Sequence, residues 1–147
     1  MHVRPAGEPI LAKFRHENGT HLRLQAFLAV RDGERRVATM RLEASPDAWS
    51  LPGENIRLNE APLDAAKRVA KSWFETPLGE PKLVDVQSYP ATGPEDDRWY
   101  LILVYEVNAP KDLKGTPDTL ELVFTPVGKA PGEFYGDHAS VFARLAK

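Results

Sequence analysis

The sequence predicts an α/β fold, a mixed sandwich of strands and helices rather than a doubly wound parallel sheet. Strand-like alternation comes first, one amphipathic helix follows, and further strands and a last helix complete the chain. Hydrophobic residues make up 42% of the 147 residues and charged residues 27%, as in folded globular proteins. The length suits one core and neither a repeat nor a linker interrupts it, so we predict a single domain over 1–147.

The amino-terminal third is predicted to form three strands joined by turns. Apolar residues alternate over 9–16, and the Asn18-Gly19 pair that follows favours a hairpin because both residues tolerate positive φ. A longer alternation over 21–30 indicates the second strand. Asp32-Gly33 indicates another turn, and 37–42 is the returning strand, so the three segments predict an antiparallel meander.

The middle of the chain is predicted to be a loop followed by a helix. Residues 43–60 are rich in turn formers, and Pro62 suits the first helical position because that position needs no N–H donor. Pro77 is expected to stop the helix. The apolar residues at helical spacing are Leu63, Ala66, Val69, Ala70, Trp73 and Phe74.

Three more strands and a short helix are predicted in the second half. The strands are expected over 83–89, 99–107 and 119–125, and Trp99 and Tyr100 are expected to pack in the core. The last helix is predicted to begin with Asp137 as its cap. The residues expected to be buried on this helix are Val141, Phe142 and Leu145.

Composition excludes several classes of function. The formal net charge of −2 gives no general footprint for nucleic-acid binding. The chain has no cysteine, so disulfides, thiolate metal sites and cysteine nucleophiles are excluded. The amino-terminal stretch has no apolar signal core, and the longest apolar run has seven residues, far short of a membrane span. We therefore expect a cytoplasmic protein that binds neither nucleic acid nor membranes.

Other catalytic patterns are missing. His16 and His21 flank a glutamate, but their spacing is one residue too long for a zinc-protease helix and an Asn-Gly turn interrupts it. Neither a G-x-S-x-G elbow nor a phosphate-binding glycine loop occurs. His2 and His138 have no ligand-like neighbours in sequence, so surface or capping roles are expected for them.

The stretch over 49–76 resembles the signature of the Nudix hydrolase family. The lead-in of that signature matches at Trp49, Leu51, Pro52 and Gly53. Glu60 falls on the glutamate before the helix, and Arg68 falls on the arginine that follows seven residues later. Glu54 stands where the family has its second glycine, and Arg57 where it has its first glutamate. The resemblance implies a Nudix-like α/β/α sandwich with a mixed β-sheet.

The resemblance breaks down at the metal-binding positions. Nudix enzymes cleave nucleoside diphosphate derivatives with a divalent metal, which three helix glutamates hold through oxygen ligands. Those positions here are Val69, Ser72 and Trp73, which lie on one helical face and supply no carboxylate. We therefore predict no metal site and no cofactor.

The leading hypothesis is a catalytically inactive Nudix-fold domain that binds a ligand or a partner. A nucleotide-like or other anionic small molecule is the expected ligand, and the resemblance also suggests a homodimer. The candidate ligand-binding residues are Arg41, Arg57 and Arg68. Residues 1–42 carry a net charge of +4, from 8 Lys/Arg and 4 Asp/Glu, which favours an anionic ligand near Arg41. For Arg68 an internal bracing role competes with ligand binding.

Two alternatives stay open. One is a divergent pyrophosphohydrolase in which Glu60 is the catalytic candidate and carboxylates such as Glu106 or Glu121 complete a Mg²⁺ or Mn²⁺ site. In that case Glu60 contacts the metal, whereas the competing role for Glu60 is to brace the loop. The other alternative is a protein-interaction module with no small ligand.

Overall fold

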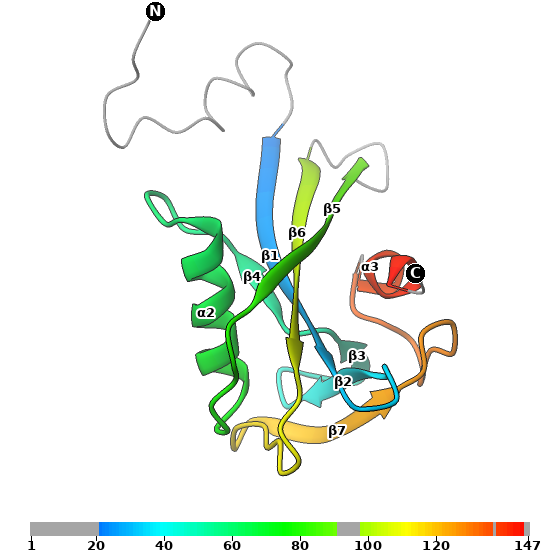
Figure 1. Ribbon diagram of the computed structural model, residues 1–147. Coiled ribbons are helices and arrows are strands. Elements are labelled where there is room, and N and C mark those ends of the chain that lie inside the picture. Colours follow the sequence, from blue (N-terminus) through cyan, green and yellow to red (C-terminus); the bar gives the residue numbers. More distant parts are fainter. Residues whose placement is uncertain (1–20, 91–97, 137, 146–147) are drawn as a thin grey trace, which may run out of the picture.

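The computed structural model describes residues 21–90, 98–136 and 138–145 (Figure 1). Its elements are β1 His21–Arg31, β2 Val37–Leu42, β3 Ser45–Ser50, β4 Gly53–Asn55, α2 Pro62–Trp73, β5 Lys82–Pro90, β6 Arg98–Asn108, β7 Thr119–Thr125 and α3 His138–Arg144. The strand predicted over 9–16, its Asn18-Gly19 turn and the Asp137 cap lie outside the described residues. No described helix is long and apolar enough to cross a membrane.

The strands form one mixed sheet in the order β3-β2-β1-β6-β5, and β4 and β7 pair with β1 and β2 respectively. β1 and β6 run parallel along their full lengths, from His21 opposite Arg98 to Arg31 opposite Asn108. The other pairings are antiparallel. The predicted mixed sheet is therefore confirmed.

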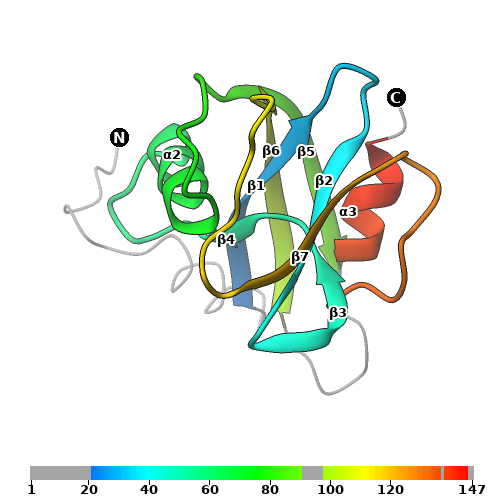
Figure 2. The same cartoon turned by 90° about the horizontal axis from the view of Figure 1, so that it is seen from below.

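Side-chain alternation along β1 divides the core into two layers. Phe27 and Ala29 pack with the residues of α3, whereas Leu28 and Val30 pack with those of α2. The two helices accordingly lie on opposite faces of the sheet (Figure 2). This arrangement confirms the predicted α/β/α sandwich, and Val141, Phe142 and Leu145 are buried as expected.

α2 begins at Pro62 as predicted but ends at Trp73, four residues before Pro77. The helix stops because Phe74 takes an extended conformation, with φ −132° and ψ 140°, and forms a bridge to Gly115. Phe74 is buried in the α2 layer, so tertiary packing ends the helix earlier than the proline does.

The loop predicted over 43–60 is wrong in part, because it contains β3 and β4. β3 pairs with β2, and β4 pairs with the middle of β1, where Gly53 lies opposite Phe27. A Cβ at Gly53 would come within 2.8 Å of the Phe27 ring, so the glycine permits this close approach. Both strands are held by pairing with a neighbour rather than by their own alternation.

Trp99 is not a core residue, contrary to the prediction. Its side chain is 40% exposed because it lies near the amino-terminal end of β6, opposite Leu22 and Pro90 at the end of the sheet. The predicted turn at Asp32-Gly33 is confirmed, but the left-handed residue in it is Arg35, with φ 66°. The Asp32 carboxylate supports the turn by accepting the backbone N–H groups of Glu34 and Arg36.

Candidate functional site

The segment that resembles the Nudix signature forms β4, the following loop and α2. Its centre is the Arg68 guanidinium, which donates to both carboxylate oxygens of Glu60 at 2.8 and 3.0 Å. It also donates to Glu54 Oε1 at 3.0 Å and to the backbone carbonyl of Asn55 at 2.8 Å. A single cation therefore ties the helix to β4 and to the loop, and we call Arg68, Glu60 and Glu54 the arginine brace.

Glu60 is committed to this brace. Besides Arg68, its Oε1 accepts the backbone N–H of Arg57 at 2.9 Å. The hydrogen bonds from Arg68 are the main cause that lowers the pKa of the Glu60 carboxyl to about 2, and the backbone bond and the nearby positive charges add to it. Asn59 takes a left-handed φ of 64°, which lets the loop turn so that Glu60 faces Arg68. Both Glu60 oxygens are thus occupied within the protein.

Two of the three metal-binding positions of the signature, Val69 and Trp73, pack in the core layer between α2 and the sheet. Val69 has no exposed surface and belongs to the α2 layer of the core with Leu28 and Val30. Trp73 is partly buried and packs against the same layer. Ser72 is exposed, but a neutral hydroxyl is a poor ligand for Mg²⁺. The residues present therefore do not fit the divalent metal that the fold family implies.

The carboxylates considered as replacements have arginine partners. Glu106 pairs with Arg31 at 2.8 Å and with Arg35 at 3.2 Å, and these two arginines lower its pKa against the opposing effect of burial. Glu121 pairs with Arg41 at 2.9 Å. Within residues 21–90, 98–136 and 138–145 no three His, Asp or Glu side chains are grouped so that they could hold a metal.

The three candidate ligand-binding arginines do not converge. Arg57 and Arg68 meet at Glu60, but Arg41 is on β2, where it pairs with Glu121, donates to the Pro46 carbonyl and lies 5.7 Å from the Trp49 ring. The exposed side chain of Arg57 forms no ion pair with any residue that the structure describes. Of the three guanidinium groups, only that of Arg57 forms no hydrogen bond within the described residues, and its interaction with Glu60 is through charge alone.

Two residues of this region were missed from the sequence. Glu54 completes the brace, and the available signal was its place in the family pattern, where a glycine carries no side chain. The surface or capping role predicted for His138 is wrong, because its Nδ1 accepts the backbone N–H of Leu51 at 3.0 Å and its ring lies 4.8 Å from that of Phe27. Burial lowers the pKa of His138 to about 4, so the imidazole is neutral at pH 7.

Comparison with known proteins supports the fold alone. No family model and no curated protein matches the sequence. Among solved structures, a MutT NUDIX hydrolase from Burkholderia pseudomallei is similar with a TM-score of 0.65 and 18% identity, covering 86% of this chain and 99% of that one. A MutT protein from Methanosarcina mazei Go1 has a TM-score of 0.63 and 15% identity, covering 87% of this chain and 97% of that one.

A third similar structure holds ligands. It is a bifunctional NMN adenylyltransferase/ADP ribose pyrophosphatase from Francisella tularensis, complexed with AMP and a manganese ion. Its TM-score is 0.57 and its identity 14%, and the match covers 92% of this chain and 44% of that one. The resemblance seen in residues 49–76 is therefore confirmed at the level of the fold: this chain has the fold of the Nudix hydrolases.

Proposed function

We propose that the protein is a catalytically inactive, cytoplasmic Nudix-fold domain whose role is binding. The observation that carries the proposal is the burial of Val69 at the position of a metal-binding glutamate. A carboxylate at that place would face the hydrophobic layer between α2 and the sheet rather than a hydrated cation. This part of the helix therefore packs in the core and offers no carboxylates to hold the metal that hydrolysis would need.

The remaining acid of the signature supports the same proposal. A Mg²⁺ ion at Glu60 would have to compete with Arg68, which already neutralises that carboxylate through two hydrogen bonds. Charge-assisted paired bonds of this kind are among the stronger ones in proteins. Losing them would also release Glu54 and the loop, so metal binding at Glu60 would be opposed by the folding energy of the brace.

We propose a nucleotide-like anion as the ligand of the loop that bears Arg57. That arginine is exposed and forms no ion pair within the described residues, although its charge helps to lower the pKa of Glu60, and the similar Francisella tularensis protein is complexed with AMP. A thermal-shift titration with AMP and ADP in the presence of a chelator tests this, because a ligand that binds only the folded state raises the melting temperature. Stabilisation that Arg57→Met removes would support it, and an unchanged melting temperature at millimolar nucleotide would refute it.

Catalytic inactivity is tested by incubating the full chain with a panel of nucleoside diphosphate derivatives and Mg²⁺ or Mn²⁺. We expect no turnover above the protein-free reaction. Substantial turnover that a chelator abolishes would overturn the proposal and favour the divergent pyrophosphohydrolase. In that event Glu60→Gln should abolish activity, while Glu34→Gln, which breaks an exposed ion pair with Arg36, is the matched control.

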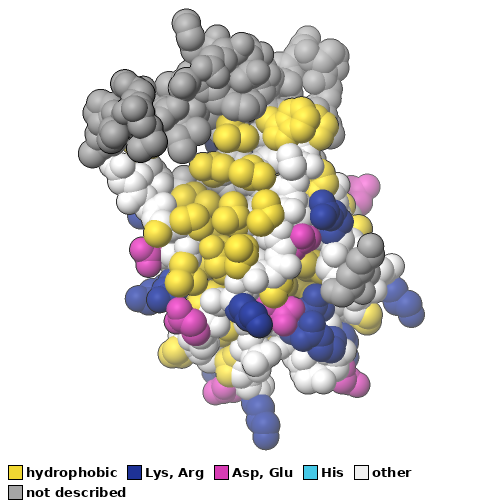
Figure 3. Space-filling view, turned by 45° about the horizontal axis from the view of Figure 1, so that its top comes forward, with side chains coloured by type: hydrophobic (Ala, Val, Ile, Leu, Met, Phe, Trp, Pro, Cys, Tyr) yellow, Lys and Arg dark blue, Asp and Glu magenta, His cyan; other side chains and the backbone are white. Residues whose placement is uncertain are grey.

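A second candidate function is association with another copy of this chain. β5 is the edge strand next to β6, and several apolar side chains in this part of the sheet are exposed by 40% to 50%, where Figure 3 shows apolar side chains gathered. These residues are Leu83, Val84, Val86 and Trp99. Exposed apolar patches of this kind are typical of interaction surfaces.

The structure of β5 favours association through its exposed apolar side chains rather than through backbone pairing with a strand of the second copy. The Asp85 carboxylate accepts the N–H of Val86 at 2.9 Å, and an inward or edge-blocking charge opposes pairing with a further strand. Sedimentation of the full chain tests the homodimer. Val86→Lys should dissociate it, whereas Leu120→Lys, at a similarly exposed leucine on β7, should not. A wild-type monomer at high concentration would refute this candidate.

A further inference from the structure

A cavity of about 530 Å³ lies beside the carboxyl-terminal half of α2, outside the face that the Nudix signature uses for metal. Its wall is a second helical stripe formed by Lys67, Ala70 and Lys71, whose spacing of three and four residues places them on one side of the helix. Phe74, which follows the helix in an extended conformation, adjoins this stripe. Val69 is not among its lining residues. The cavity is therefore distinct from the arginine brace and from the loop that bears Arg57, and its use does not depend on whether the domain hydrolyses anything.

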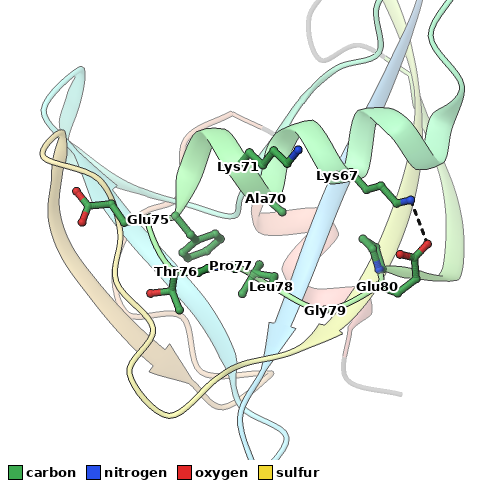
Figure 4. A pocket seen from close by; sticks show the side chains of 11 residues that line it. Lys67, Ala70, Lys71, Glu75, Thr76, Pro77, Leu78, Gly79 and Glu80 are labelled. Atoms are coloured by element: carbon green, nitrogen blue, oxygen red, sulfur yellow. Dashed lines mark ion pairs between the residues drawn. The ribbon is translucent and has the colours of Figure 1, made fainter.

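The floor and far side of the cavity are apolar. The chain leaves α2 and returns beneath it over residues 76–81, and Figure 4 shows Pro77 and Leu78 facing Ala70 of the helix. Pro81 completes the lining and is buried. A volume of about 530 Å³ falls in the range, roughly 300–1,000 Å³, of sites for small molecules.

The walls are fixed before any ligand arrives. Thr76 donates its hydroxyl to the Asp112 carbonyl at 3.2 Å and accepts the Lys114 N–H at 2.8 Å. The Glu75 N–H donates to the Lys114 carbonyl at 2.9 Å. Pro77 and Pro81 restrict the backbone between these anchors and β5. A preformed cavity costs less conformational entropy on binding than one that must order a loop.

The charges around the cavity select one kind of ligand. Lys67 is 3.3 Å from Glu80, and the Glu75 carboxylate points away from the apolar floor (Figure 4). Lys71 forms no ion pair with the described part of the chain, which leaves one uncommitted ammonium beside an apolar floor. One free positive charge, with two carboxylates on the same rim, favours a monoanion over a polyanion such as a nucleotide.

We infer that this cavity binds a small organic carboxylate with an aromatic or branched aliphatic body. The body occupies the space between Ala70 and Leu78, and the carboxylate accepts from the Lys71 ammonium. The ligand class thus differs from the nucleotides that the fold resemblance suggests. The Lys67–Glu80 pair remains intact as part of the rim.

The test is an amide-resonance titration of the full chain with 4-phenylbutyrate, beside its neutral amide 4-phenylbutyramide. We expect saturable shifts over residues 67–81 with the carboxylate and binding weaker by about three- to fivefold with the amide, as for one partly exposed ion pair. Lys71→Met should weaken carboxylate binding by a similar factor. Lys111→Met, at an exposed lysine that does not line the cavity, should leave it unchanged.

Three outcomes would overturn the inference. The first is that 4-phenylbutyrate causes no saturable shift at 10 millimolar, on the order of the weakest useful affinities. The second is that the shifts centre on residues outside 67–81. The third is that the two lysine variants, or the carboxylate and its amide, bind equally well. The hydrolysis assay and the AMP titration are independent of all three results, so failure here leaves the proposed function standing.

Discussion

Arg68 and Val69 are neighbours in α2, yet they belong to regions with opposite character. Arg68 reaches three groups on β4 and the loop and remains partly open to water, with a side chain 17% exposed. Val69 turns about 100° around the helix axis and has no exposed surface. The comparison teaches that the loop geometry of this fold and its metal chemistry are separable: the arginine brace suffices for the first without the ligands of the second.

The largest loss of stability is expected when a carboxylate is introduced at Val69, the buried residue of the two. Val69→Glu would bury a charge with no partner, so we expect a loss of more than about 4 kcal/mol of unfolding free energy, or failure to fold. Urea unfolding followed by circular dichroism measures it. Leu120→Glu is the matched control, since Leu120 is 46% exposed and the change should cost about 0.5 kcal/mol or less. Equal stability of the two variants would mean that the α2 face is not core.

The next effect is expected on the brace side. Arg68→Met would leave Glu60 and Glu54 facing each other without their cation, and we expect a loss of about 2–3 kcal/mol, below the range for fully buried pairs. Arg41→Met removes the arginine of the more exposed pair with Glu121, and we expect it to lower the free energy of unfolding by about 1 kcal/mol or less. If both substitutions cost the same in urea unfolding, Arg68 is an ordinary surface cation and not a brace.

The sequence predicted these regions well where local interactions decide the structure and poorly where contacts between distant residues decide it. The predictions that α2 begins at Pro62 and that Arg68 lies on it depend on local sequence signals, and both are confirmed. β3 and β4 were missed because they depend on pairing with β2 and β1, and because Pro46 and Gly53 look like turn residues. The early helix end depends on Phe74 packing, which no local pattern encodes.

The sequence predicted least about the parts of the site that form only when distant segments of the chain come together. The cavity forms only because residues 76–81 fold back beneath α2 and are anchored by Lys114. The partner of Glu106 could not be found from spacing, since Arg31 is 75 residues away. The residues at the metal-binding positions of the signature are read directly from the sequence, and the absence of a metal site stays a prediction.

The stability contributions of Glu60 in the arginine brace and of His138, which links α3 to the loop before β4, are lost in different pH ranges. The pKa of His138 is lowered from 6.5 to about 4, so its contribution is fully present above pH 6.5 and is lost as pH falls toward 4. The loss is on the order of 3 kcal/mol once the pH lies below 4. The pKa of Glu60 is lowered from 4.5 to about 2, so its contribution is present above pH 4.5 and lost toward pH 2.

Urea unfolding at a series of pH values measures both windows. His138→Asn, which keeps an acceptor near Leu51 but does not titrate, should flatten the profile between pH 6.5 and 4. Glu60→Gln should flatten only the part below pH 4.5. A wild-type profile that is level from pH 7 to 4.5 would show that the His138 imidazole is not held neutral by burial.

The smallest effect is expected at Ser72, the one exposed residue among the three that stand at the metal-binding positions of the signature. Ser72→Glu should change the free energy of unfolding by about 0.5 kcal/mol or less, because an exposed helix position tolerates a glutamate. It should also leave Mg²⁺ binding undetectable by calorimetry at millimolar concentration. One carboxylate is not a divalent-cation site when its neighbours on the same face are a buried valine and a packed indole. Millimolar binding by Ser72→Glu would instead mean that Glu60 can leave Arg68 and join the new acid, so the brace and the metal chemistry would be coupled after all.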